Sequence, residues 1–131
     1  MIENLNKKQN PNPNQILVGV KSFYDGIVFT DGTTIDDEHE QDCCEDHYLS
    51  YSDLTEQDFE GLLFDISNND FIRKIEDYGI ELVPINGHSV KIPGYADNNG
   101  FYSDELKLRI NNKSLNQEFI IDITECQTWR Y

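Results

Sequence analysis

Hydrophobic and polar residues alternate along much of the chain, which is the pattern of β-strands with one buried face. The clearest alternation covers residues 106–110 and returns at 119–123, with the polar stretch 111–114 between them. Two alternating runs around a short polar stretch predict a β-hairpin near the C-terminus.

A second hairpin is expected around Asp31-Gly32, which stands between two apolar runs. An Asp-Gly pair favours a two-residue type I′ turn, because that turn requires positive φ at both positions. Such a turn would place Val28 opposite Ile35.

One stretch has helical spacing. Thr55 can act as the N-cap residue and Asp58 stands three positions further on. The apolar residues that follow recur at helical intervals: Phe59, Leu62, Leu63 and Ile66. We therefore predict a helix over residues 56–65, packed on the sheet through its apolar face.

Further strands are expected at 16–20, within 71–85 and at 90–92, which gives seven or eight strands in all. One helix with so many strands indicates a small α+β domain with a mainly antiparallel sheet. Residues 1–15 are rich in Asn and almost free of apolar side chains after Leu5, so we expect a disordered tail there. Residues 16–131 are expected to form a single domain.

Charge narrows the functional classes. The 131 residues include 10 Lys and Arg against 25 Asp and Glu, a formal charge of −15. So acidic a surface repels phosphate, which disfavours direct binding to nucleic acid and favours a basic protein partner or a cation. No apolar run reaches the ~20 residues of a membrane-spanning helix, and the start of the chain lacks a signal peptide, so we expect a cytoplasmic protein.

The three cysteines are Cys43, Cys44 and Cys126. Adjacent cysteines rarely bridge one another, and an odd number leaves a thiol over, so free and largely buried thiols are expected. Catalysis by Cys43 or Cys44 is disfavoured, because neighbouring carboxylates raise the pKa of a thiol. We expect no enzymatic activity.

The densest charge lies in residues 36–47, where a zinc site is one alternative. His39, Cys43 and His47 are spaced four apart, and imidazole with thiolate suits Zn²⁺. That spacing needs a helix, which the pattern does not favour, and Cys43-Cys44 is not a CxxC motif. His39, Cys43 and Cys44 remain weak candidate ligands, and no cofactor is expected otherwise.

Two motifs carry a family resemblance: HEQDCCE at 39–45 and GYADNNGFYS at 94–103. In this order they resemble a family of small phage and bacterial proteins with a domain of unknown function. The resemblance implies a largely β phage or prophage accessory protein without an established activity. The family pattern has no histidine at position 47, which disfavours the zinc site. The binding residues we expect in the two motifs are His39, Glu40, Asp42, Glu45, Asp97, Asn98, Asn99 and Tyr102.

Several aromatic residues offer another binding surface. Tyr48, Tyr51, Phe101, Tyr102 and Trp129 could form a protein interface at a sheet edge or stack on a small planar ligand. Together these features favour a non-catalytic binding protein that associates with a basic host protein or a small ligand. Such a protein could act against a host defence system or as a mimic of DNA. A metal-binding protein and a minor virion component are the alternatives.

Overall fold

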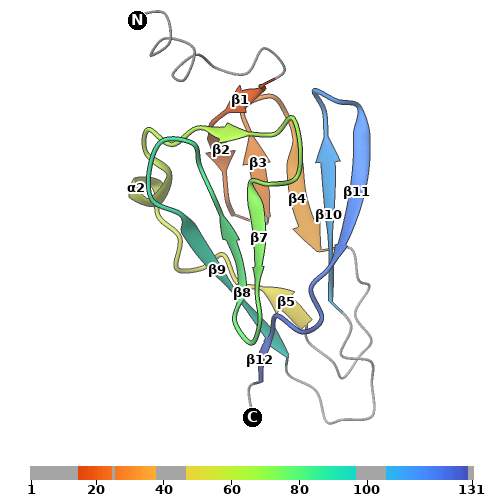
Figure 1. The fold of residues 1–131 in the computed structure, drawn as a ribbon. Helices are drawn as coiled ribbons and strands as arrows, with labels where there is room; N and C mark the ends of the chain where they lie inside the picture. Colours follow the sequence, from red (N-terminus) through yellow and green to blue (C-terminus); the bar gives the residue numbers. More distant parts are fainter. Residues whose placement is uncertain (1–14, 25, 38–46, 97–105, 130–131) are drawn as a thin grey trace, which may run out of the picture.

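The computed structural model describes residues 15–24, 26–37, 47–96 and 106–129, which form two β-sheets packed against each other (Figure 1). Twelve short strands and one four-residue helix make up this part of the chain. The predicted, mainly antiparallel sheet structure is confirmed. The α+β class overstates the helix, and the described fold is essentially all-β.

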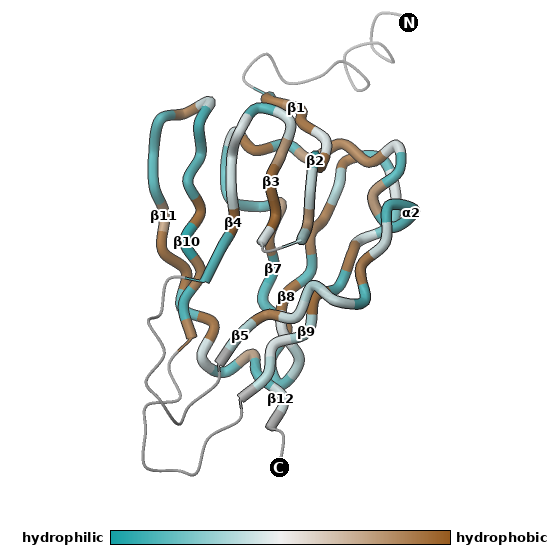
Figure 2. Tube along the Cα trace, turned by 180° about the vertical axis from the view of Figure 1, so that it is seen from behind, coloured by the Kyte–Doolittle hydropathy of each residue, from teal (hydrophilic) through white to brown (hydrophobic). Residues whose placement is uncertain are grey.

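The first sheet has five antiparallel strands in the order β11-β10-β4-β3-β2. It contains the predicted C-terminal hairpin, in which Leu108 faces Ile121 and Ile110 faces Phe119. Figure 2 shows the hydrophobic stretches of β3 and β11 in this sheet. Its strands are β2 (Val20–Ser22), β3 (Ile27–Phe29), β4 (Thr34–Asp37), β10 (Lys107–Asn112) and β11 (Gln117–Asp122).

The second sheet is built around β9. Its order is β12-β9-β8-β7, and β5 also pairs with β9. Because β5 and β12 both pair with Tyr95, they lie on opposite edges of β9. The expected strands within 71–85 and at 90–92 are confirmed. The strands are β5 (His47–Leu49), β7 (Ile72–Ile75), β8 (Gly79–Leu82), β9 (Val90–Ala96) and β12 (Thr128–Trp129).

A two-stranded sheet of β1 (Leu17–Val18) and β6 (Phe64–Asp65) completes the fold. The strand expected at 16–20 is thus divided at Gly19 between β1 and β2. The core draws on both large sheets, with the Phe29 ring 5.7 Å from that of Phe64 and 5.8 Å from that of Phe71. One core therefore holds the two large sheets together.

The predicted two-residue turn at Asp31-Gly32 is wrong. The amide of Gly32 donates to the Phe29 carbonyl, and the amide of Phe29 donates to the Thr33 carbonyl, so the turn contains three residues, 30–32. Gly32 has a φ of 94°, as a three-residue turn with a bulge requires. The register consequently moves by one position, and Val28 faces Thr34 instead of Ile35.

The carboxylate of Asp31 holds this turn against the second hairpin. It accepts hydrogen bonds from the Thr33 amide at 2.9 Å and from the Ser114 hydroxyl at 2.6 Å. Burial alone would raise the pKa of Asp31, but the bonds from Ser114 and Thr33 outweigh it and lower the pKa below its usual value. The ionised carboxylate is therefore part of the folded structure.

The predicted helix at 56–65 is also wrong beyond its first turn. Helix α2 comprises Glu56–Phe59, and the Thr55 amide donates to the Asp58 carboxylate at 2.7 Å, as expected of the N-terminus. The chain then leaves the helix, with a φ of 75° at Gly61. The side chain of Asn86 accepts from the Leu63 amide and donates to the Gly61 carbonyl, both at 2.8 Å. These bonds occupy backbone groups that a longer helix would need.

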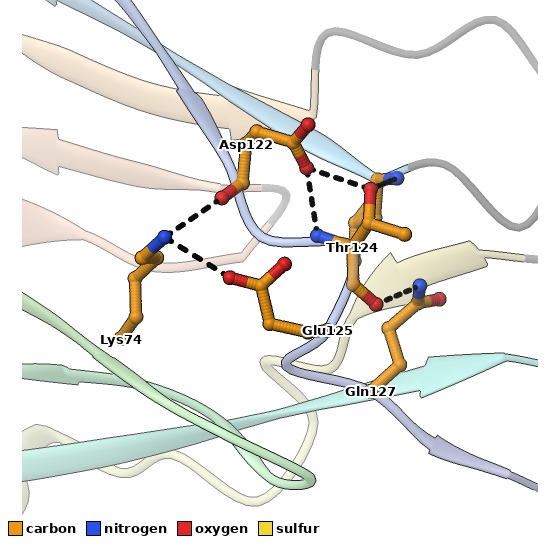
Figure 3. A network of polar contacts seen from close by, with 6 residues as sticks. Lys74, Asp122, Thr124, Glu125 and Gln127 are labelled. Carbon is orange, nitrogen blue, oxygen red and sulfur yellow. Dashed lines mark hydrogen bonds and ion pairs between the residues drawn. The ribbon is translucent and has the colours of Figure 1, made fainter.

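Polar side chains connect the end of β11 to the second sheet (Figure 3). The Lys74 ammonium group donates to the Asp122 carbonyl at 3.4 Å and to the Glu125 carboxylate at 3.1 Å. The Asp122 carboxylate accepts from the amide and hydroxyl of Thr124, whose carbonyl accepts from the Gln127 side chain. The hydrogen bonds from Thr124 lower the pKa of Asp122. This network fixes the crossing from β11 towards β12.

Candidate functional site

The residues expected to bind lie outside the described part of the chain. They are His39, Glu40, Asp42, Glu45, Asp97, Asn98, Asn99 and Tyr102. The candidate metal ligands Cys43 and Cys44 lie outside it as well. Their roles stay predictions.

The fold nevertheless brings the ends of the two motif segments together. Segment 38–46 starts after Asp37 and ends before His47, and segment 97–105 starts after Ala96. Asp37 pairs with Leu108, and His47 pairs with Ala96. Segment 38–46 therefore begins close to where segment 97–105 ends, and segment 97–105 begins close to where segment 38–46 ends. Both places lie towards the lower end of Figure 1. No pattern in the sequence predicts this proximity.

A groove lined by aromatic side chains lies beside this end. Its volume is about 470 Å³, and Tyr24 on its wall is 94% exposed. The rings of Tyr48 and Tyr95 are 5.6 Å apart, and those of Phe23 and Phe59 are 5.4 Å apart. We call it the aromatic groove; its lining residues are Phe23, Tyr24, Tyr48, Leu49, Ser50, Tyr51, Ser52 and Leu54.

The expected aromatic surface is only partly visible. Tyr48 and Tyr51 do lie in one groove, whereas Phe101 and Tyr102 fall outside the described residues. The sequence did not predict that Phe23 and Tyr24 belong to this surface, because the pattern at residues 24–26 predicts a turn. Two adjacent aromatic residues at the end of a strand were the available signal, since one can face the core while the other faces solvent.

Three further hollows share lining residues with the aromatic groove, and two of them contain aspartates. One, of about 240 Å³, is lined by Gly26, Asp36, Asp37 and Tyr51. The Asp36 carboxylate lies 3.3 Å from the Arg109 guanidinium, at a partly exposed position. Because Tyr51 lines both spaces, the hollow that contains Asp36 and Asp37 adjoins the aromatic groove.

The other hollow, also of about 240 Å³, shares Ser50 and Leu54 with the groove. Asp53, Asp58 and Lys91 are among its lining residues, and the Asp58 carboxylate accepts from Thr55 at the start of α2. Aspartates therefore line two of the hollows that adjoin the aromatic groove.

This second hollow also contains His88 and Ser89. The His88 ring nitrogen Nε2 lies 3.2 Å from the Asp58 carbonyl, and the Ser89 hydroxyl donates to Glu81 at 2.9 Å. These bonds direct the two side chains to different partners and do not form a nucleophile with its base.

Residues 15–24, 26–37, 47–96 and 106–129 contain no group of three or more His, Cys, Asp or Glu side chains that could hold a metal ion. Cys126 is a buried free thiol, as expected, and burial raises its pKa. It is a core residue in the structure.

Comparison with family models, curated proteins and solved structures gives no match to this chain. The resemblance to small phage and bacterial proteins therefore stays a prediction. Among the residues that the structure describes, no helix has the length and apolar character needed to cross a membrane.

Proposed function

We propose that this chain is a non-catalytic binding protein that holds a basic segment of another protein in the aromatic groove. The single observation that carries the proposal is that two hollows with acidic lining residues adjoin the groove. One contains Asp36 and Asp37, and the other contains Asp53 and Asp58.

The combination suits arginine in particular. A guanidinium group stacks on a tyrosine ring and pairs with a carboxylate in the same orientation, because it is planar and has five donors. A lysine ammonium group is not planar and stacks less well on a tyrosine ring. The −15 charge of the chain adds a longer-range attraction for a basic partner.

The resemblance to phage proteins suggests a partner in the host cell. A host protein that binds nucleic acid has a basic groove, and an acidic protein that occupies this groove would inhibit it. We include this anti-defence or DNA-mimic role in the proposal, and it rests on the resemblance and on the charge.

The test measures binding of fluorescein-labelled hexa-arginine and hexa-lysine peptides by fluorescence anisotropy. The wild-type chain should bind hexa-arginine more tightly. Tyr24→Ala should weaken that binding about two- to fivefold, the range of one exposed cation–π contact. Its thermal stability should not change, because the side chain is 94% exposed.

Two matched variants separate the groove from general charge effects. Ile85→Ala removes an exposed apolar side chain elsewhere and should leave binding unchanged. Asp53→Asn and Asp70→Asn remove the same charge, but only Asp53 lines a hollow that adjoins the groove, so only Asp53→Asn should weaken binding strongly. Equal effects of the two asparagine variants would show that net charge alone attracts the peptide and would refute the proposal.

A further inference from the structure

Strand β11 is the terminal strand of the five-stranded sheet, and no strand in the described part of the chain pairs with its outer edge. It pairs with β10 over six consecutive residues without a bulge. Strand β2, at the opposite end of this sheet, has a register irregularity between Val20 and Ser22 and carries an exposed Lys21. Bulges and charged side chains, lysines above all, protect sheet edges against pairing. Strand β11 has no bulge and no lysine, and its charged residues are the acidic Glu118 and Asp122.

The backbone groups on the outer edge follow from the ladder. The amide of Ile123 donates to the Leu106 carbonyl, towards β10. Since hydrogen bonding alternates along an antiparallel strand, residues 118, 120 and 122 direct their amides and carbonyls to the outer edge. The Asp122 carbonyl accepts from Lys74, which marks one end of the open stretch (Figure 3).

The same residues present their side chains on the exposed face. Ile120 is 48% exposed, between the exposed Glu118 and Asp122. On the opposite face, Phe119 and Ile121 are only partly buried against the core. An added strand would cover these two side chains as well as Ile120.

We propose that the outer edge of β11 is a docking site for an extended segment of another protein, with basic residues on both sides of an apolar one. Opposite charges across a strand pair stabilise it, so basic side chains fit opposite Glu118 and Asp122. A second copy fits poorly. In an antiparallel pair centred on Ile120, Glu118 of each copy would face Asp122 of the other.

This site is separate from the aromatic groove, because no residue of β11 lines that groove. The probe is the peptide acetyl-Lys-Thr-Ile-Thr-Lys-amide, titrated into ¹⁵N-labelled protein and followed by NMR. The amide signals of Glu118 and Ile120 should shift. The same peptide with an N-methyl group on its isoleucine lacks one backbone donor, so its affinity should be about fivefold lower.

Two variants test the site on the protein. Ile120→Pro removes an outward amide and leaves the ladder to β10 intact, because proline is tolerated where the amide faces away from the sheet. It should abolish the shifts and leave hexa-arginine binding unchanged. If Ile120→Pro does not fold, Ile120→Lys serves instead, because its charge repels the basic peptide without altering the backbone.

The reciprocal variant is Tyr24→Ala, which should weaken hexa-arginine binding and leave the pentapeptide titration unchanged. The two experiments thus test the proposal for the aromatic groove and the proposal for the β11 edge independently. Equal binding of the N-methylated peptide, shifts confined to residues outside β11, or dimerisation of the chain through β11 would each overturn the proposal.

Discussion

Replacement of Asn112 by alanine should cost a large part of the stability of the fold. Asn112 is fully buried at the end of β10. Its side-chain nitrogen donates to the Ile66 carbonyl at 2.7 Å, and its side-chain oxygen accepts from the Leu115 amide at 2.9 Å. One buried amide therefore joins the first sheet to the chain that follows β6.

The magnitude follows from these bonds. Two hydrogen bonds contribute about 1 kcal/mol each, and a buried carbonyl left without its donor costs about 1–3 kcal/mol more. Asn112→Ala should thus lower the free energy of unfolding by about 3–5 kcal/mol. For a chain of this size, that corresponds to a decrease in Tm of roughly 10–20 °C.

The assay is urea unfolding followed by circular dichroism across a pH series, with Asn112→Asp as the matched variant. A carboxylate at 112 would face the Ile66 carbonyl, so burial should raise its folded pKa above the unfolded value of about 3.9. The protonated form keeps both bonds. The difference in free energy of unfolding between wild type and Asn112→Asp should therefore be small below pH ~3.9. It should grow as the pH rises through the folded pKa of the substituted carboxyl group at position 112. A loss under about 1 kcal/mol in Asn112→Ala, or a deficit of Asn112→Asp that does not vary with pH, would refute the reasoning.

Two other predictions concern the sheets. Gly79→Ala should destabilise the protein by about 3 kcal/mol in the same urea assay, because its methyl group would overlap the Ile92 carbonyl and lie 2.7 Å from the Gly94 amide nitrogen; a neutral effect would contradict the close packing of β8 on β9. Asp31→Asn should be less stable than wild type at neutral pH. Because the pKa of Asp31 is lowered from 3.8, its contribution is present above that pH and is lost as the pH falls through the folded pKa, so the two curves should converge in acid. If the stability of Asp31→Asn stays equally far below that of wild type throughout the acid range, the ionised carboxylate is not what stabilises the wild type.

The sequence predicted strands well where one periodicity alone fits, as at residues 106–123. It failed at 62–66, where two periodicities fit the same residues. Leu62, Phe64 and Ile66 are buried and Leu63 is 38% exposed, which is the alternation of an extended segment. Helical spacing from Phe59 concealed that alternation. The contacts that distinguish the two come from distant parts of the chain: the pairing of β6 with β1 and the bonds from Asn86.

The prediction of a two-residue turn at Asp31-Gly32 was wrong for a related reason. An Asp-Gly pair is compatible with both a two-residue turn and a three-residue turn, and the difference of one residue shifts the register. The bond from Ser114 to Asp31 belongs to the observed turn and comes from the other hairpin. Local sequence does not contain that contact.

The candidate site was predictable only in its chemistry. From the sequence, the acidic residues predicted a basic partner, and the aromatic residues predicted a protein interface or a stacking surface for a planar ligand. Their meeting was not, because the aromatic groove joins Phe23 and Tyr24 to Tyr48 and Tyr51 across a separation of more than twenty residues. Such contacts depend on the packing of the two sheets.

The paired anchors of the two motif segments also matter for protein engineering. The Asp37–Leu108 and His47–Ala96 pairs fix the ends of both segments within strand ladders. Because each pair holds an end of one segment close to an end of the other, a substitution that disrupts one pair would displace ends of both segments. Redesign of either segment should therefore leave both pairs unchanged.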